Sequence, residues 1–205
     1  MADDAEATTD GRRARGDRTR RQVVTRAAAL ASISGLSAVS LNDVARDLGV
    51  SKSGVAAAFG TKEELELATV AAAREIFIEE VVAPALSRKR GRPRLRALVD
   101  SWLSYVERGV FPGGCFMAAV LPEYDTKPGP VRDALHDARR AWRQLIADQV
   151  AQMQEDGQLE DRLPAPLLAF EVDALLAAAN LERNLSGDDG ALTDARRLLR
   201  ARFDL

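Results

Sequence analysis

Apolar residues recur every three or four positions along most of this chain, which is the spacing of one face of an α-helix. No stretch of useful length alternates apolar and polar residues as a half-buried strand would. The pattern therefore predicts an all-α protein. The segment 115–124 is apolar but contains Pro122, so the pattern leaves it open between helix and loop. The expected helices cover residues 19–34, 41–48, 51–59, 61–83, 94–108, 131–155, 167–185 and 191–203.

In the first part of the chain, polar residues that can cap a helix and glycines that can end one mark the expected helix boundaries. Ser40, Ser51 and Thr61 each precede a helical pattern and can accept a hydrogen bond from a free N–H of its first turn. Three short helices followed by a longer one are therefore expected, and Pro84 is expected to bend or end the longer one. Each short helix is expected to stop at a glycine, namely Gly35, Gly49 or Gly60.

Charge is distributed unevenly along the 205 residues, although the net charge is only −2. Residues 1–10 carry four acids and no base, whereas residues 11–60 carry nine basic residues against three acidic ones. Residues 1–17 also lack apolar periodicity. We therefore expect a disordered arm at 1–17, a small basic unit at 18–64, and a larger, mildly acidic helical domain at 65–205.

The second and third short helices, joined by Gly49 and Val50, have the spacing of a helix-turn-helix. Residues from both helices can pack them together. The first turn of the third helix would then be exposed, where such units present side chains to base edges in the major groove of DNA. The expected packing residues are Val44, Ala45, Leu48, Val50 and Val55, and the expected exposed residues are Ser51, Lys52, Ser53 and Gly54.

Residues 19–67 resemble the DNA-binding domain of the TetR family of bacterial transcriptional regulators, most strongly over LNDVARDLGVSKSGVAAAFGTKEELELA. Phe59 and the run Thr61-Lys62-Glu63-Glu64-Leu65 match the family pattern at the start of the fourth helix. The resemblance implies that Ser51, Lys52 and Ser53 lie in a recognition helix. It also implies that Ser40 and Lys62 contact DNA phosphates.

One departure from the family pattern lies in the recognition helix, where Ala56, Ala57 and Ala58 replace larger, often aromatic residues. The loss of one neutral backbone contact at Ala56 is worth on the order of 1 kcal/mol. Arginines near the arm, among them Arg18 and Arg20, are expected to offset it by neutralising phosphates.

For the rest of the chain, the resemblance implies a helical regulatory domain with a ligand cavity and a dimer interface made by the last two helices. The segment GGCFMAAVLPEYDTKPGPVRDAL resembles the matching region of one subgroup of the family. We expect an apolar cavity for an unidentified small-molecule effector, lined by Trp102, Tyr105, Cys115, Phe116, Tyr124, His136 and Trp142. The expected homodimer interface contains Phe170, Leu175, Leu176, Ala179 and Leu198.

The leading hypothesis is therefore a cytoplasmic transcriptional regulator, specifically a repressor, that binds a palindromic operator in double-stranded DNA as a dimer and is released by a small-molecule inducer. One cysteine excludes an internal disulfide, and one histidine excludes a Cys/His zinc cluster. No apolar run reaches the roughly 18 residues of a membrane span. No phosphate-binding glycine loop or nucleophile elbow points to an enzyme, and no cofactor is expected. Glu123 and Asp125 are interpreted as solvated loop acids.

Two other functions remain open at this point. One is an all-helical enzyme or small-molecule carrier whose basic domain binds DNA weakly or not at all, which the alanines at 56–58 would favour. The other is an interaction module whose basic first helix binds an acidic protein. Binding to duplex DNA, and its dependence on salt, separates both from a regulator.

Overall fold

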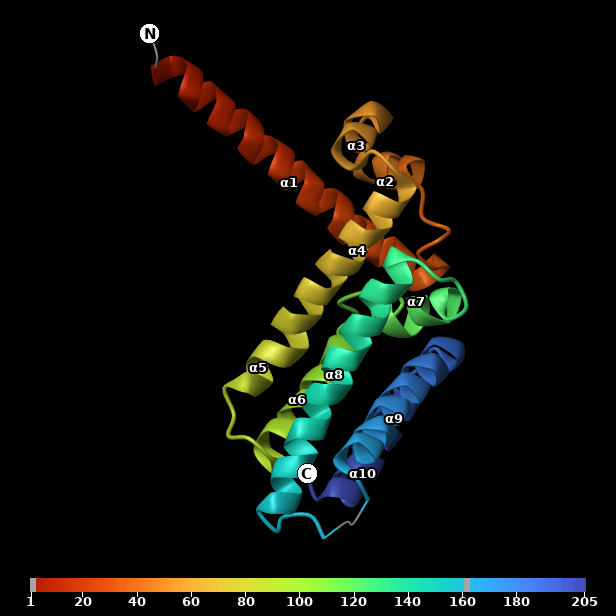
Figure 1. Cartoon of the computed structure of the whole chain (residues 1–205). Coiled ribbons are helices and arrows are strands. Elements are labelled where there is room, and N and C mark those ends of the chain that lie inside the picture. The colour runs from red at the N-terminus through yellow and green to blue at the C-terminus, as the bar shows by residue number, and fades with distance from the viewer. Residues whose placement is uncertain (1–2, 161–162) are drawn as a thin grey trace.

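The computed structural model describes residues 3–160 and 163–205, except for the side chains of residues 3–15 and of Ala57, and every regular element in this part of the chain is a helix (Figure 1). An all-α fold was predicted and is confirmed. The helices are α1 (Asp3–Ser34), α2 (Leu41–Leu48), α3 (Lys52–Phe59), α4 (Lys62–Phe77), the π-helical turn η1 (Ile78–Val82), α5 (Ala83–Leu86), α6 (Arg92–Glu107), α7 (Phe116–Tyr124), α8 (Pro130–Glu155), α9 (Ala165–Ser186) and α10 (Gly190–Phe203).

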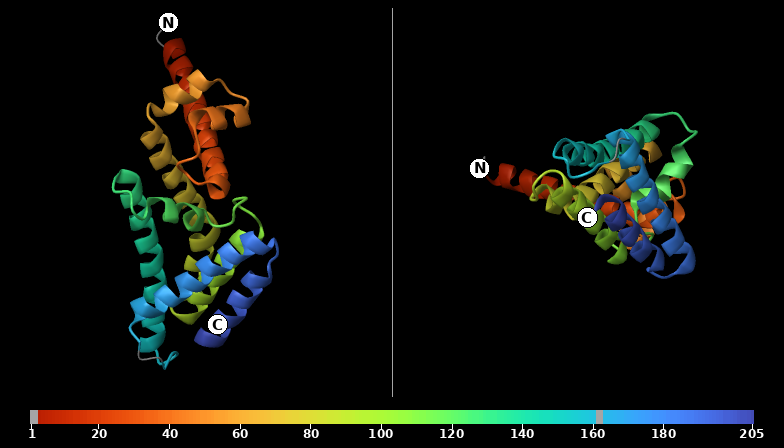
Figure 2. Two further views of the ribbon diagram at one scale, coloured as in Figure 1. Left: turned by 90° about the vertical axis from the view of Figure 1, so that its right-hand side faces the viewer. Right: turned by 90° about the horizontal axis from the view of Figure 1, so that it is seen from below.

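The helices form two regions that share α4. At one end, α2, α3 and the start of α4 pack against the C-terminal half of α1 (Figures 1 and 2). At the other end, α8 packs against the rest of α4, α6 packs against η1, and α9 and α10 pack against α8 and α6 respectively. Buried residues of both regions form one continuous hydrophobic core, from Val23 in α1 to Phe203 in α10. A structural change in one region can therefore reach the other through packed helices.

Helix α1 begins far earlier than expected. Residues 1–17 were predicted to be a disordered arm, but α1 already begins at Asp3, and its N-terminal half projects away from the other helices (Figure 1). Residues 1–2 lie outside the described part. The physical reason lies in composition: this segment has no proline and is rich in alanine and arginine, which favour helix without any apolar face.

Pro84 and Pro122 are accommodated in the helices in different ways. Before Pro84 the helix widens into η1, where the Ala83 N–H bonds to the Ile78 carbonyl five residues back. Pro84 then occupies the first turn of α5, where its missing N–H costs nothing. Pro122 lies inside α7, so the segment whose conformation the sequence left open is helical.

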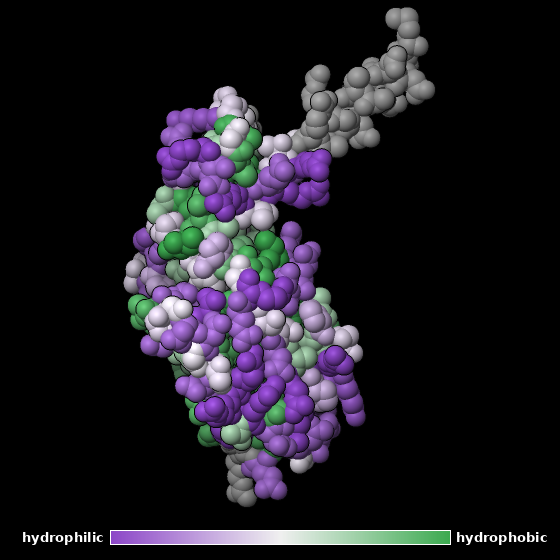
Figure 3. Space-filling model, turned by 180° about the vertical axis from the view of Figure 1, so that it is seen from behind, coloured by the Kyte–Doolittle hydropathy of each residue, from purple (hydrophilic) through white to green (hydrophobic). Residues whose placement is uncertain are grey.

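Hydrophilic residues cover most of the face drawn in Figure 3, and hydrophobic residues reach it in separate patches. Within the described ranges, no helix is both long enough and apolar enough to cross a membrane.

Candidate nucleic-acid interface and ligand cavity

The turn between α2 and α3 has the geometry that a helix-turn-helix requires. Gly49 has a φ of +65°, a left-handed conformation that favours glycine, and the Val50 N–H bonds back to the Ala45 carbonyl. Val44, Ala45 and Val55 are buried between the helices, as predicted. Val50 is not part of this packing, because its side chain is 39% exposed at the tip of the turn.

The first turn of α3 is fully open to solvent. Ser51 is the N-cap, and its hydroxyl accepts a hydrogen bond of 3.2 Å from the Gly54 N–H. Lys52 and Ser53 are exposed beside it, and within the described chain Lys52 makes no hydrogen bond or ion pair. The side chains predicted to meet DNA are thus available at a helix N-terminus, where free N–H groups also attract phosphate.

Two arginines of α1 hold the small domain together. The Arg20 guanidinium lies 4.3 Å from the centre of the Phe59 ring and donates to the Ala58 carbonyl. Arg26 forms an ion pair with Asp47 of α2, which holds the pKa of that carboxyl below its usual value. Arg20 is therefore already engaged within the domain, whereas Arg18 is exposed without such a contact.

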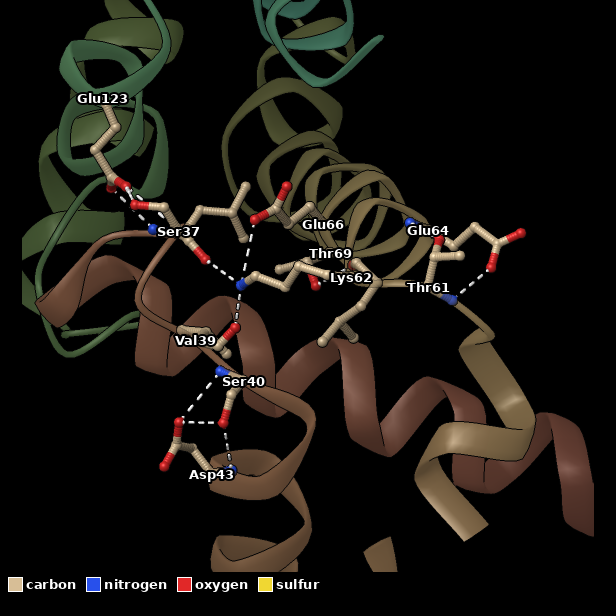
Figure 4. A network of polar contacts seen from close by, with 12 residues as sticks. Ser37, Val39, Ser40, Asp43, Thr61, Lys62, Glu64, Glu66, Thr69 and Glu123 are labelled. Atoms are coloured by element: carbon tan, nitrogen blue, oxygen red, sulfur yellow. Dashed lines mark hydrogen bonds and ion pairs between the residues drawn. The ribbon is translucent and has the colours of Figure 1, made fainter. Parts of the chain in front are cut away.

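Ser40 and Thr61 are helix caps of the same kind. The Ser40 hydroxyl accepts from the Asp43 N–H while the Asp43 carboxylate accepts from the Ser40 N–H, and Thr61 and Glu64 do the same at α4. The Ser40 hydroxyl and N–H lower the pKa of Asp43. Both predicted caps are confirmed, and both are closed by an acid of their own helix (Figure 4).

The ammonium group of Lys62, predicted to contact a DNA phosphate, is engaged within the protein, although the side chain is 42% exposed. Its ammonium group donates to the carbonyls of Leu36 (3.1 Å) and Val39 and lies 3.2 Å from the Glu66 carboxylate (Figure 4). The sequence pattern placed Lys62 at the right position of the helix. It could not show that the carbonyls of a turn 23 to 26 residues earlier would capture its ammonium group.

Glu123 was predicted to be a solvated loop acid, but its carboxylate is bound to the turn between α1 and α2. From the last turn of α7, its carboxylate accepts hydrogen bonds from the N–H groups of Leu36 (2.8 Å) and Ser37 (3.0 Å) and from the Ser37 hydroxyl (2.5 Å). Gly35 has a φ of +83°, and a Cβ there would collide with this carboxylate. That glycine was the only local signal of the contact.

Glu123 and Lys62 therefore hold opposite sides of one turn. The carboxylate of α7 binds the N–H groups of residues 36 and 37, and the ammonium group of α4 binds the carbonyls of residues 36 and 39 (Figure 4). This turn connects α1 to α2, so the helix-turn-helix is joined to α7 and α4 by polar contacts as well as by the core.

A cavity of about 740 Å³ opens among α4, α6, α7, α8 and α9. Three rings in its wall pack edge to face: the Phe77 ring centre lies 5.8 Å from that of Tyr105 and 5.1 Å from that of Trp142. Burial raises the pKa of the Cys115 thiol, as expected of an inert cysteine. Five of the predicted residues line the cavity, namely Trp102, Tyr105, Cys115, Phe116 and Trp142.

The other two predicted cavity residues lie elsewhere. His136 is exposed on another face of α8, in a shallow depression beside Arg140 and Arg143, because six residues of helix turn it well away from Trp142. Tyr124 is buried at the far end of α7 against Glu66, and burial together with that carboxylate raises the pKa of its phenol.

The cavity also contains polar groups that were not predicted from the sequence. Asp173 forms a 3.0 Å ion pair with Arg139, and the Asn180 side-chain oxygen accepts from the Cys115 N–H at 2.8 Å. Arg74 also borders the cavity. These residues lie on three different helices, so only the tertiary structure brings them together. Within the described ranges, no three His, Cys, Asp or Glu side chains form a group that could hold a metal ion.

The predicted dimer residues divide between surface and core. Phe170 and Leu198 are about half exposed, and Leu175 is partly buried, but Leu176 and Ala179 are buried within the protomer and cannot form an interface. The exposed apolar row on α9 follows a single face of the helix instead, at Leu167, Phe170, Ala174, Ala178, Leu181 and Leu185.

Comparison with known proteins covers both regions. The family described as "Bacterial regulatory proteins, tetR family" matches residues 23–69, and the one described as "Tetracyclin repressor-like, C-terminal domain" matches residues 91–199. Comparison with curated proteins gives no match.

Solved structures of similar fold include a TetR transcriptional regulator from Chloroflexus aurantiacus, with 27% identity, a TM-score of 0.83, and coverage of 91% of this chain and 94% of that one. AibR, in complex with isovaleryl coenzyme A and operator DNA, has 19% identity, a TM-score of 0.74, and coverage of 90% and 97%. A putative regulator from Saccharomonospora viridis, in complex with choline, has 24% identity, a TM-score of 0.72, and coverage of 90% and 95%.

Proposed function

Because the chain belongs to the TetR family of bacterial regulatory proteins, we propose that it is a ligand-responsive repressor that binds operator DNA as a homodimer and leaves it when a small molecule fills the cavity. TetR-family proteins are transcriptional regulators and not enzymes. The proposed role requires access to chromosomal DNA, in keeping with the cytoplasmic location expected from the sequence.

The start of α3 provides the DNA contact. Ser51, Lys52 and Ser53 are exposed and enter the major groove, where lysine can donate to guanine and the hydroxyls can bond bases or phosphates. Arg18 adds a positive charge close to the backbone of the duplex. AibR, whose structure contains operator DNA, supports this docking, since its fold covers 90% of this chain.

The apolar row on α9 and Leu198 on α10 provide the dimer contact. Two-fold pairing through them removes large side chains such as Phe170 and Leu185 from water. The same symmetry sets two recognition helices about 34–36 Å apart, one turn of DNA, which requires a palindromic operator.

The observation that carries the proposal is the double role of α7. Residues 116–119, 121 and 122 of this helix line the cavity, and the next residue, Glu123, holds the turn between α1 and α2. A ligand that displaces α7 therefore moves or releases the helix-turn-helix. Coupling of this kind typically changes DNA affinity by about 1–3 kcal/mol.

Selection of genomic fragments by the purified protein, followed by gel retardation, tests the DNA-binding part. We expect a palindromic site near the protein's own gene, bound by a dimer. Failure to retard any selected fragment at low salt would contradict the proposal.

Glu123→Gln tests the coupling. The amide keeps an acceptor for one N–H but loses the charge that holds three donors, so we expect unchanged ligand binding and a weaker effect of ligand on DNA binding. Asp125→Asn is the matched control, because its exposed carboxylate makes no ion pair in the described chain. An equal response of both variants to ligand would contradict a role for Glu123.

A second candidate is a small-molecule-binding protein with vestigial DNA binding. The recognition helix favours it, since Gly54, Ala56 and Ala58 offer no long side chain to a base, and Arg20 and Lys62 are engaged inside the protein. Ligand binding without any DNA retardation would select this function over the first.

A further inference from the structure

The charges around the cavity indicate which class of molecule fills it, if the cavity is the effector site proposed above. Its wall is mostly apolar and aromatic, with Phe77, Tyr105 and Trp142 at its centre. Among the described residues that line it, three are charged: Arg74, Arg139 and Asp173. The arrangement of these three decides the sign of charge that a ligand can carry.

Asp173 is not free to receive a cationic ligand. Its carboxylate is 3.0 Å from the Arg139 guanidinium, and its side chain is only 13% exposed. A ligand ammonium group would have to displace Arg139 from a partly buried pair, which leaves one charge without its partner. The pair is therefore neutral as a unit.

Arg74 is the unmatched charge. In the part of the chain that the structure describes, its guanidinium makes no hydrogen bond and no ion pair. Its neighbours three and four positions away on the helix are apolar, so no acid of α4 can reach it as Glu66 reaches Lys62. The cavity consequently carries an excess of one positive charge at the position of Arg74.

We infer that the effector is an organic acid: its apolar body lies among the aromatic side chains and its carboxylate pairs with Arg74. Arg74 is an exposed residue of the cavity wall, and its planar guanidinium can bind a carboxylate through two parallel hydrogen bonds. The walls give affinity to many apolar molecules, and Arg74 selects the acids among them.

The two tryptophans of the chain allow a direct test, because both Trp102 and Trp142 line the cavity. Tryptophan fluorescence of the full-length protein is titrated with 4-phenylbutyrate, 4-phenylbutanamide and 4-phenylbutylamine, which share one body and differ in the charge of the head. We expect the acid to bind about tenfold more tightly than the amide, and the amine most weakly.

Three variants assign the preference to a residue. Arg74→Gln should remove the preference for the acid and leave the affinity of the amide unchanged. Arg96→Gln, the same change at an exposed arginine of α6 outside the cavity, should alter neither. Asp173→Asn frees the Arg139 guanidinium and should raise the affinity of the acid further, so the two cavity variants move in opposite directions.

The inference is overturned if the amide or amine binds as well as the acid, if Arg74→Gln behaves like Arg96→Gln, or if no probe changes the fluorescence. Gel retardation of a selected DNA fragment in parallel separates this failure from that of the proposed function. A protein that binds DNA but prefers the amine would refute only the inference that the effector is an organic acid. A protein that prefers the acid but never binds DNA refutes the regulator and leaves the ligand class standing.

Discussion

Helices α3 and α4 begin with nearly the same residues but present them in opposite ways. Ser51-Lys52 starts α3 and Thr61-Lys62 starts α4, and both hydroxyls cap their helices. Lys62 has an acid four residues later, Glu66, and turn carbonyls within reach, so its ammonium group is engaged. Lys52 has Ala56 at that position, and among the residues that the structure describes its ammonium group has no hydrogen-bond or ion-pair partner. The same local sequence therefore gives a structural contact in one helix and an accessible charge in the other.

The largest effect is expected at the turn that Lys62 and Glu123 share. Gly35→Ala should lower the free energy of unfolding by about 3 kcal/mol, because a positive φ is strained for alanine and its Cβ displaces the Glu123 carboxylate. Urea denaturation measures the loss. Gly157→Ala is the control: its φ of +66° is also left-handed but no atom lies near the new Cβ, so strain alone, roughly 1–2 kcal/mol, should remain. Equal losses would show that Glu123 does not require the glycine.

The next largest effect is a difference in protein stability between variants of Lys62 and of Lys52. Lys62→Met should lower the free energy of unfolding by about 2 kcal/mol, since it leaves the Leu36 and Val39 carbonyls and Glu66 without their donor. Lys52→Met, with the same change in charge, should stay within about 0.5 kcal/mol of the parent protein. Similar denaturation curves for the two variants would show that Lys62 contributes no more to the free energy of unfolding than Lys52 does.

DNA binding should reverse that order. Lys52→Met is expected to weaken binding to a selected fragment about tenfold and to reduce the dependence of affinity on salt concentration by about one phosphate contact. Lys62→Met, measured where it is folded, should have the smaller effect because its ammonium group already serves the turn. Gel retardation at several salt concentrations gives both quantities, and a larger loss for Lys62→Met would identify it as the phosphate contact.

The smallest effect concerns the start of α2, where Ser40 lowers the pKa of Asp43. A lowered pKa in the folded protein stabilises the fold above the usual carboxyl pKa of about 4, and this contribution is lost as pH falls through the lowered value. Asp43→Asn should therefore be less stable than the parent protein at neutral pH, with the difference shrinking in acid. A constant difference for Asp43→Asn would mean that the cap does not depend on its charge.

Several features of both regions could be predicted from the sequence. The caps at Ser40, Ser51 and Thr61 and the ends of α2 and α3 follow from signals three or four residues apart. Four aromatic residues of the cavity were predicted from the sequence, namely Trp102, Tyr105, Phe116 and Trp142, but Phe77 was not. Arg74 and Asp173 were missed because charged residues on a helix have the same local pattern whether they border a cavity or face water.

The sequence by itself determined that this chain is helical, where α2 and α3 begin and end, and which family its first domain resembles, because those properties depend on neighbours along one helix. Tertiary structure alone decided which polar groups are engaged. Glu123 binds an N–H 87 residues away, and Arg139 pairs with Asp173 across 34 residues. A hydrogen bond depends on separation in space, and the packing of several helices sets that separation.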